Sequence, residues 1–268
     1  MLYLRIRRIS KQESGIELKL SGNTILITGG GTGIGYALAE GLVEAGSEVL
    51  VCGRRKSMLQ AAKRQLPAVR SIQCDVTVEA DRVRLLRWAT TRFPDLNVLV
   101  NNAGIQRQVN FCSPRISRPI RPNDDEVAIN LASQIRLCAM FTPMLLKKET
   151  AAILNISSGL AFVPIATMPI YCATKAAIHS FTISLRHQLR NTSIRVFEAV
   201  PPTTDTALDA SFAGAEEQAY RGISPEEVAK AILAGLQTDK EEILIGEAQS
   251  LYQAALSDPR SIFQKLNG

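Results

Sequence analysis

The chain has 268 residues, of which 46% are hydrophobic and 21% are charged, a composition typical of one globular domain with a sizeable core. The formal net charge is +6, but the basic residues are scattered and never form a run of five or six, which argues against nucleic acid as a partner. No apolar run approaches the ~20 residues that a membrane span needs.

Residues 1–18 form a basic segment in which four lysines and arginines precede the first acid, Glu13. Mitochondrial transit segments are similarly rich in arginine and poor in acids, but they are also rich in serine, which this segment is not. We therefore expect a flexible extension over residues 1–18, with mitochondrial targeting as the alternative, and one domain over residues 19–268.

Apolar runs alternate with segments of helical spacing from residue 23 to about residue 200, and this alternation predicts a parallel sheet covered on both faces. We expect one Rossmann-like, doubly wound α/β domain with about seven strands. The expected strands are Thr24–Thr28, Glu48–Cys52, Val69–Cys74, Asn97–Val100, Ala151–Ile156, Ile194–Ala199 and Glu242–Ile245, and the expected helices are Ile34–Ala45 (ending at Gly46), Lys56–Gln65, Glu79–Phe93, Asp124–Phe141, Tyr171–Arg190 and one that Ser224-Pro225-Glu226-Glu227 begins.

Two stretches read as loops. Residues 107–123 contain three prolines, and Thr203–Gly222 is polar and rich in alanine. The second stretch follows the sixth strand, at the edge of the sheet where open α/β folds bind ligands, so we expect a substrate lid over residues 203–222.

Cysteine and histidine usage indicates a reduced, intracellular protein. The five cysteines are odd in number, no two are two residues apart, and no secretory signal is visible, so we expect a cytoplasmic location. The only two histidines, His179 and His187, lack the spacing of metal ligands, and we expect no bound metal.

A glycine-rich turn joins the first strand to the first helix, with the spacing Gly29-x3-Gly33-x-Gly35. We expect Gly29 to allow the sharp turn, Gly33 to let a pyrophosphate approach the backbone, and Gly35 to let the helix pack on the strand. The free N–H groups of the helix start would bind the phosphates. The alternative is a glycine turn without a ligand, and the predicted phosphate loop also includes Gly31, Thr32 and Ile34.

The end of the second strand predicts which dinucleotide binds. An NAD site has an acid there, which accepts from the ribose 2′-hydroxyl. This strand instead ends at Gly53 and is followed by Arg54 and Arg55, whose guanidinium groups suit a 2′-phosphate. We therefore expect NADP(H) rather than NAD(H); the alternative is that both arginines merely face solvent at a helix start.

Further cofactor contacts are expected after the third and fourth strands. Asp75, followed by Val76, could accept from the adenine amino group, could cap the helix that starts near Glu79, or could do both. The small residues of Asn101–Gly104 would let the adenosine and ribose lie against the strand ends, and the residues expected to contact them are Asn102, Ala103 and Gly104.

Tyr171 and Lys175 are four residues apart and therefore share one helix face. A free tyrosine titrates near pH ~10, and a neighbouring ammonium lowers this pKa, which makes the phenol a usable acid or base near neutrality. Ser158, at the end of the fifth strand, could hold a substrate oxygen while charge develops on it. A Tyr-x3-Lys pair alone arises by chance on many helices, but the ordered set rarely does.

Together these motifs resemble the short-chain dehydrogenase/reductase family over residues 20–250. The phrases Asn155–Pro164 and Ser184–Arg190 look most similar to its DltE-like subgroup. The matching motifs are Thr28–Gly35, Asn101–Gly104, Asn130, Ser158, Tyr171 and Lys175.

The resemblance implies an NADP(H)-dependent enzyme that interconverts a small carbonyl compound and an alcohol. Tyr171 would be the acid/base, and Lys175 would bind the nicotinamide ribose and tune Tyr171. Ser158, rather than Ser157, would orient the substrate oxygen. Asn130 would hold a water that links Lys175 to solvent. The alternative is a non-catalytic NADP(H)-binding redox sensor or scaffold, although a sensor has no need of an acid/base.

The family usually has Pro-Gly after the sixth strand, whereas this chain has Pro201-Pro202. Proline removes an N–H donor there, so we expect nicotinamide contacts from Pro201 and from Thr203, Thr204 or Thr206.

The identity of the substrate is not predicted. Phe162, Val163, Ile165, Met168 and Phe212 would suit an apolar substrate pocket or the buried core. The family often pairs through its two long helices, so the resemblance also implies a homodimer or homotetramer.

Overall fold

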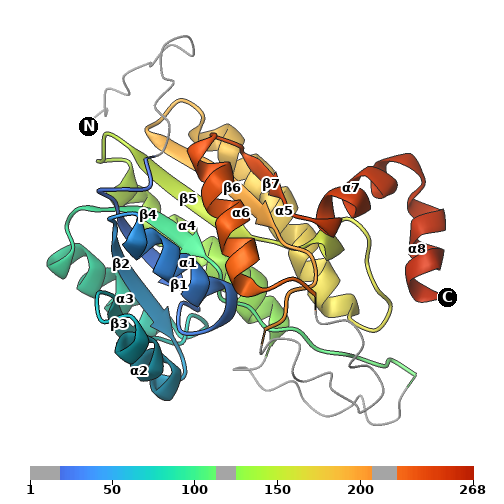
Figure 1. The fold of residues 1–268 in the computed structure, drawn as a ribbon, viewed down its shortest axis with the longest axis horizontal. Helices are drawn as coiled ribbons and strands as arrows, with labels where there is room; N and C mark the ends of the chain where they lie inside the picture. The colour runs from blue at the N-terminus through green and yellow to red at the C-terminus, as the bar shows by residue number, and fades with distance from the viewer. Residues whose placement is uncertain (1–18, 113–124, 207–221) are drawn as a thin grey trace.

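The computed structural model describes residues 19–112, 125–206 and 222–268 (Figure 1). Seven parallel strands form one sheet in the order β3-β2-β1-β4-β5-β6-β7, which confirms the predicted Rossmann-like architecture. The predicted N-terminal extension and residues 207–221 of the predicted lid lie outside the described residues. The strands are β1 (Thr24–Thr28), β2 (Glu48–Gly53), β3 (Arg70–Gln73), β4 (Leu96–Asn101), β5 (Ala151–Ile156), β6 (Ile194–Val200) and β7 (Glu242–Leu244).

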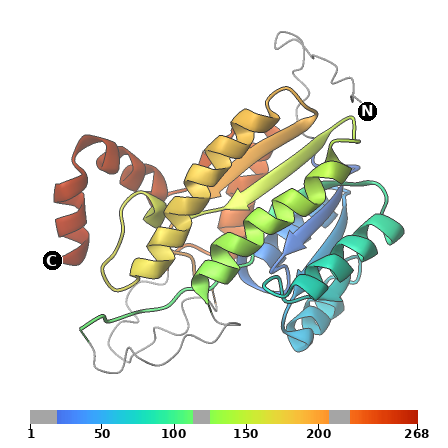
Figure 2. The same ribbon diagram turned by 180° about the vertical axis from the view of Figure 1, so that it is seen from behind.

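Helices cover both faces of the sheet, because successive strand residues point to opposite sides and both sides are apolar. Ile25 and Ile27 face one helix layer, whereas Leu26 faces the other. The layer that Ile25 and Ile27 face contains α1 (Gly33–Glu44), α2 (Lys56–Gln65) and α6 (Pro225–Gln237). The layer that Leu26 faces is nearest the viewer in Figure 2 and contains α3 (Glu79–Arg92), α4 (Ser133–Leu145) and α5 (Pro169–Leu189).

The long helix expected over Asp124–Phe141 differs from the helix observed. It starts as a π-helical segment, η2 (Val127–Ala132), which continues directly into α4 and ends four residues later than expected, at Leu145. A π-turn carries an extra residue per turn, so it is not visible in a hydrophobic pattern of 3.6 residues, and such turns are frequent at functional sites.

Two helices that the sequence pattern does not predict follow β7: α7 (Glu247–Ser257) and α8 (Pro259–Asn267). They extend away from the sheet (Figure 1), and α8 has no buried residue, which explains the weak hydrophobic signal. They nevertheless contact the loop after β5, which begins with the 3-10 turn η3 (Gly159–Ala161). The side-chain amide of Asn267 donates to the Pro164 carbonyl (3.2 Å) and its oxygen accepts from the Ala166 N–H.

The predicted helix ends are confirmed where local chemistry fixes them. Gly46 has φ +87°, and two hydrogen bonds close the end of α1, from Gly46 N–H to the Val43 carbonyl (2.9 Å) and from Ser47 N–H to the Leu42 carbonyl (3.0 Å). Across the described parts of the chain, no helix has both the length and the apolar character needed to cross a membrane.

The start of α6 is a capping box. The Ser224 hydroxyl accepts from the Glu227 N–H (3.1 Å), and the Glu227 carboxylate accepts from the Ser224 N–H (2.8 Å). Because the box satisfies two N–H groups that the helix leaves open, Ser224→Ala should lower the free energy of unfolding by about 1 kcal/mol.

Urea denaturation with an unchanged m-value would measure this loss. The matched control is Ser184→Ala, which removes an exposed hydroxyl that bonds only to the Ser180 carbonyl within α5. Equal effects of the two substitutions would contradict the capping role.

Candidate active site

A cavity of about 440 Å³ lies at the carboxyl ends of the strands, where the residues that follow β1 to β6 converge. Four of the predicted site residues are not part of its lining: Gly35, Thr203, Asn130 and Ser158. The predicted site residues that line it are Gly29, Gly31, Thr32, Gly33, Ile34, Arg54, Arg55, Asp75, Val76, Asn102, Ala103, Gly104, Tyr171, Lys175, Pro201 and Thr206.

The glycine turn is shaped for close approach by a ligand. Gly29 and Gly33 have φ +67° and +55°, a region that other residues adopt at a cost. At Gly35 a Cβ would lie 2.6 Å from the Gly29 carbonyl oxygen, so this glycine is needed for the packing of α1 on the turn. The N-cap residue Thr32 makes no side-chain cap, so its hydroxyl leaves the first N–H groups of α1 open, which fits a bound anion.

Two arginines lie beside this turn, at the end of β2. Arg55 donates from Nη2 to the Thr32 hydroxyl (3.3 Å), and the Arg54 carbonyl accepts from Gln73 Nε2 (2.9 Å). Both arginines line the cavity, while the strand itself offers no acid in its last five residues, Val49–Gly53. The turn and the guanidinium groups together form a basic end of the cavity that fits a phosphorylated ribose.

Asp75 does not cap the helix that follows it. The N-cap of α3 is Val78, and the Asp75 carboxylate accepts from the N–H (2.9 Å) and the hydroxyl (2.6 Å) of Thr77. The capping alternative is therefore wrong, because the turn formed by Asp75 and Thr77 ends before α3 begins. The contact between Asp75 and adenine stays a prediction, and Asp75 does line the cavity.

One hydroxyl joins the ends of β1 and β4 under the cavity. Thr28 Oγ1 accepts from the N–H groups of Asn102 and Ala103 (both 3.0 Å), and the Asn102 amide donates to the Thr28 carbonyl (2.9 Å). These bonds hold the Asn102–Gly104 segment against the strand ends. The segment therefore forms a wall of the cavity and does not fill it.

Tyr171 and Lys175 lie together on the first turns of α5 and are both buried, with exposed fractions of 6% and 4%. Lys175 Nζ donates to the Ile156 carbonyl at the end of β5 (2.9 Å) and lies 5.5 Å from the centre of the Tyr171 ring. Burial lowers the pKa of Lys175 to about 8, and the negative charge of Glu198 opposes this shift. The ammonium is thus positioned to favour the Tyr171 phenolate.

Asn130 lies in the π-helical segment η2 and is fully buried. Its side-chain amide binds the backbone of Ile105 in both directions (2.8 Å each) and donates to the Thr174 hydroxyl (3.2 Å). A Cβ built on Gly104 would lie 3.4 Å from Asn130 Oδ1 and 3.9 Å from Lys175 Nζ, so both groups face the same small space beside Gly104. A water relay through that space stays a prediction.

Of the two serines after β5, Ser157 lines the cavity, whereas Ser158 is the N-cap of η3. Ser158 Oγ accepts from the Leu160 N–H (3.2 Å), which leaves the hydroxyl hydrogen available to a substrate. Ser157 Oγ is 3.4 Å from the Ala199 carbonyl in β6.

The threonines after Pro202 differ in their surroundings. The Thr203 carbonyl accepts from the Ile223 N–H (3.2 Å), and the buried Thr204 hydroxyl donates to the Pro202 carbonyl (2.9 Å). Thr206 is the threonine of this group that lines the cavity, facing Gly33.

The apolar side chains expected in a substrate pocket after β5, Phe162, Val163, Ile165 and Met168, are not part of the cavity lining. Phe162 makes edge contacts with His179 of α5 (ring centroids 4.8 Å apart) and with Tyr252 of α7 (4.7 Å). Val163 and Met168 are buried, and Met168 packs with Tyr171. Phe212 lies outside the described residues.

Comparison with known proteins identifies the family. The family described as short chain dehydrogenase matches residues 23–217. The chain belongs to the short-chain dehydrogenases. This short-chain dehydrogenase is therefore an oxidoreductase of a family that uses nicotinamide cofactors. It is 45% identical over 250 residues to "Uncharacterized oxidoreductase DltE" of Bacillus subtilis (strain 168), an alignment that covers 93% of this chain and 98% of that protein.

Solved structures share the fold of this short-chain dehydrogenase. A short chain dehydrogenase from Burkholderia cenocepacia J2315, in complex with NADP, has a TM-score of 0.79 and 26% identity, with 93% of this chain and 99% of that chain covered. A 3-ketoacyl-(acyl-carrier-protein) reductase from Brucella melitensis, complexed with NADH, has a TM-score of 0.71 and 26% identity, with coverage of 81% and 91%.

Several residues that line the cavity were not among the predicted site residues of this short-chain dehydrogenase. Some lie in or directly after a strand, and others, such as Met58 and Leu59 of α2, are apolar helix residues whose spacing fits the core equally well. They are Gly53, Met58, Leu59, Cys74, Ile105, Gln106, Arg107, Ile129, Ile156 and Ser157.

The lowered pKa of Lys175 makes stability depend on pH. Its pKa is about 8 in the folded protein, against an ordinary value of 10.5, so between these values the unfolded chain holds one more proton. The stability of the wild type should therefore rise with pH in this window relative to Lys175→Met, which has no such proton. Between pH 7 and 9.5 the relative gain should be about 2 kcal/mol.

Urea denaturation of the wild type and the Lys175→Met variant at several pH values would measure the difference. Lys230→Met, which removes an exposed lysine from α6, controls for the loss of a surface charge. A difference between wild type and Lys175→Met that stays constant from pH 7 to 9.5 would contradict the lowered pKa.

Proposed function

We propose that this protein is an NADP(H)-dependent oxidoreductase that interconverts a small-molecule carbonyl compound and an alcohol. The observation that carries the proposal is the pairing of Tyr171 with the buried Lys175 on one wall of a cavity whose other end is the glycine turn with Arg54 and Arg55. A proton donor and a dinucleotide cradle thus face one space.

The residues present fit a nicotinamide dinucleotide, which when bound supplies or accepts the hydride. In the reductive direction, the Tyr171 phenol donates its proton to the substrate oxygen. The Lys175 ammonium stabilises the phenolate that remains, and the Ser158 hydroxyl donates to the same substrate oxygen. Oxidation of an alcohol runs through the same groups, with the Tyr171 phenolate as the base.

Asn130 and Gly104 support the return of the proton. In our proposal a water held in the space beside Gly104 passes a proton from solvent to Lys175, and Lys175 passes it to Tyr171. Asn130 Oδ1, which faces that space, orients the water.

The preference for NADP(H) is part of this proposal. The similar structures carry NADP in one case and NADH in another, so they do not decide between the two cofactors. What supports NADP(H) is the end of β2, where Gly53 stands in place of an acid and Arg54 and Arg55 follow.

We also propose that the protein forms a homodimer or homotetramer through α4 and α5. Two large apolar side chains on these helices are exposed, Ile135 on α4 (37%) and Ile183 on α5 (45%). Such side chains favour burial against a second copy.

The catalytic assignment predicts that Tyr171→Phe lowers turnover by roughly 10²-fold or more, because the proton donor is lost. NADPH binding, measured by fluorescence titration, should remain. Turnover would be followed as NADPH oxidation over a panel of aldehydes, ketones and quinones.

The control is Tyr36→Phe, which removes a hydroxyl from α1 outside the cavity lining. Near-normal turnover of the Tyr171 variant would overturn the assignment. A wild type that binds NADPH tightly but turns over no member of the panel would favour a non-catalytic redox sensor or scaffold.

The cofactor assignment predicts that Arg54→Ala weakens NADPH binding by roughly tenfold or more and changes NADH binding little, since only NADPH carries the 2′-phosphate. Arg64→Ala, which removes an exposed arginine from the last turn of α2, is the matched control. Equal losses for NADPH and NADH would mean that the 2′-phosphate is held elsewhere.

A further inference from the structure

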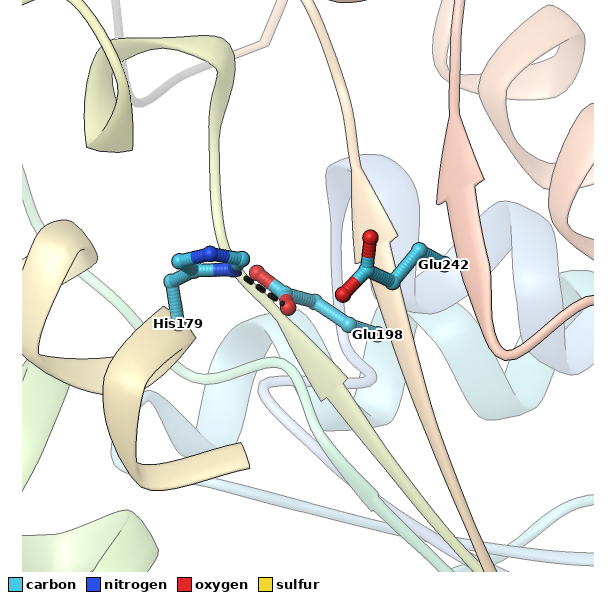
Figure 3. A group of neighbouring side chains, drawn as sticks. All are labelled: His179, Glu198 and Glu242. Atoms are coloured by element: carbon cyan, nitrogen blue, oxygen red, sulfur yellow. Dashed lines mark hydrogen bonds and ion pairs between the residues drawn. The ribbon is translucent and has the colours of Figure 1, made fainter. Parts of the chain in front are cut away.

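A cluster of ionisable side chains lies behind the candidate active site, where α5 crosses β6 and β7 (Figure 3). Figure 3 shows Glu198 of β6 between His179 of α5 and Glu242 of β7. His179 Nδ1 is 2.8 Å from Glu198 Oε2, and donor atoms of the three residues lie within 4.8 Å of one another. The Glu198 side chain is completely buried, whereas His179 and Glu242 are partly exposed.

Glu198 belongs to a polar row that crosses the sheet. In the strand register Asn101 pairs with Asn155, Asn155 with Glu198, and Glu198 with Glu242. Asn101 Nδ2 donates to Asn155 Oδ1 (2.9 Å), and Asn155 Nδ2 donates to the Thr182 hydroxyl of α5 (2.9 Å). Both asparagine amide groups thus donate to neutral partners, and Glu198 is the fully buried acid of the row.

One member of the row, Asn155, directly precedes the residue whose carbonyl holds Lys175. Lys175 Nζ binds the Ile156 carbonyl, and Ile156 directly follows Asn155, the register partner of Glu198. Lys175 and His179 are also one turn apart on the same face of α5. The His179 contact therefore brings the Glu198 carboxylate to the side of α5 that carries Lys175.

One carboxylate oxygen of Glu198 has no hydrogen-bond partner among the described residues. Oε2 is bound by His179, whereas the buried Oε1 is not bound. An ionised carboxylate oxygen in this position is costly unless a positive charge lies near it. The buried ammonium of Lys175 in turn needs a negative charge nearby, because its described hydrogen-bond partner, the Ile156 carbonyl, is neutral.

We propose that Glu198 is a positioning residue for the catalytic pair, with His179 holding its carboxylate so that this buried negative charge keeps Lys175 protonated beside Tyr171. The inference rests on the function proposed above and extends it to a residue that does not line the cavity. The direction of the electrostatic effect agrees, since Glu198 raises the pKa of Lys175 against the effect of burial.

The other charged groups around Glu198 come from α5, β7 and the residue before β7. From α5, Arg186 lies 3.6 Å from the Glu242 carboxylate and 3.5 Å from that of Glu241. The hydrogen bond to Glu198 raises the pKa of His179, and Glu242 adds to that shift while Arg186 opposes it. Arg186 and Lys175 already supply positive charge to the cluster, so it does not depend on a metal ion for charge balance.

The test is the pKa of Lys175 in the cofactor-free protein, measured by NMR of 13C/15N-labelled lysine and assigned with Lys175→Met. Glu198→Gln keeps the shape and removes the charge, so the pKa should fall by roughly one unit or more from about 8. Because this readout needs no turnover, it stays informative even if no substrate is found and the proposed function fails. In carbonyl reduction, the basic limb of the kcat/KM profile should move to lower pH by a similar amount.

Three variants complete the design. Glu198→Asp keeps the charge and should restore most of the pKa, and His179→Asn keeps a donor to the carboxylate and should not lower it. Glu242→Gln makes the same chemical change on the neighbouring strand and should shift the pKa less than Glu198→Gln. Circular dichroism and melting curves would establish that each variant folds.

An unchanged Lys175 pKa in folded Glu198→Gln would overturn the proposal, as would equal falls in Glu198→Gln and His179→Asn, which would indicate a packing effect. Zinc chloride is the remaining probe. Stoichiometric Zn²⁺ binding that shifts the His179 ring signals would show that the cluster is a metal site, and it would overturn the proposal as well. We expect no such shift.

Discussion

The hydrogen bond between Lys175 and the Ile156 carbonyl is the interaction on which the rest of the site depends. It places an ammonium group inside the protein, at the junction of α5 with the end of β5, where burial opposes the charge. The features around it reduce that penalty or use the charge: the Tyr171 ring lies 5.5 Å away, the Gly104 backbone leaves a small space beside it, and the Glu198 carboxylate supplies opposite charge. A protein selected for stability alone would have little reason to bury this ammonium.

The fold was predictable because each of its elements carries a local signal. The bounds of β1, α2 and β5 match the predicted ranges residue for residue, since apolar strand runs and a helix between turn residues are visible in any short window. The ends of α1 and α6 were predictable for a related reason, because Gly46 and Ser224 act on backbone groups within their own turn. By contrast, α7 and α8 bury almost nothing and gave no core pattern, and the π-turn at Asn130 has a period that the helical pattern does not contain.

The candidate site was predictable to the extent that it is built from strand ends. In a parallel sheet these ends meet at one edge, so Gly29, Arg54, Asn102 and Tyr171 could be brought together from their places in the chain. Details that depend on side-chain direction were not predictable. Asp75 bonds to Thr77 rather than capping α3, and Ser157 rather than Ser158 reaches the cavity lining. The proximity of Glu198 to His179 required the packing of α5 against β6, which no spacing in the sequence encodes.

The contacts of Phe162 connect helix α5 with helix α7 near the C-terminus. Its ring lies against His179, one turn beyond Lys175, and against Tyr252 in α7, while Asn267 in α8 bonds to the Pro164 and Ala166 backbone. The loop after β5 is therefore braced by α7 and α8 as well as by the sheet. Substitutions in α7 or α8 can therefore shift this loop, and with it Ser158, without touching the glycine turn or the sheet.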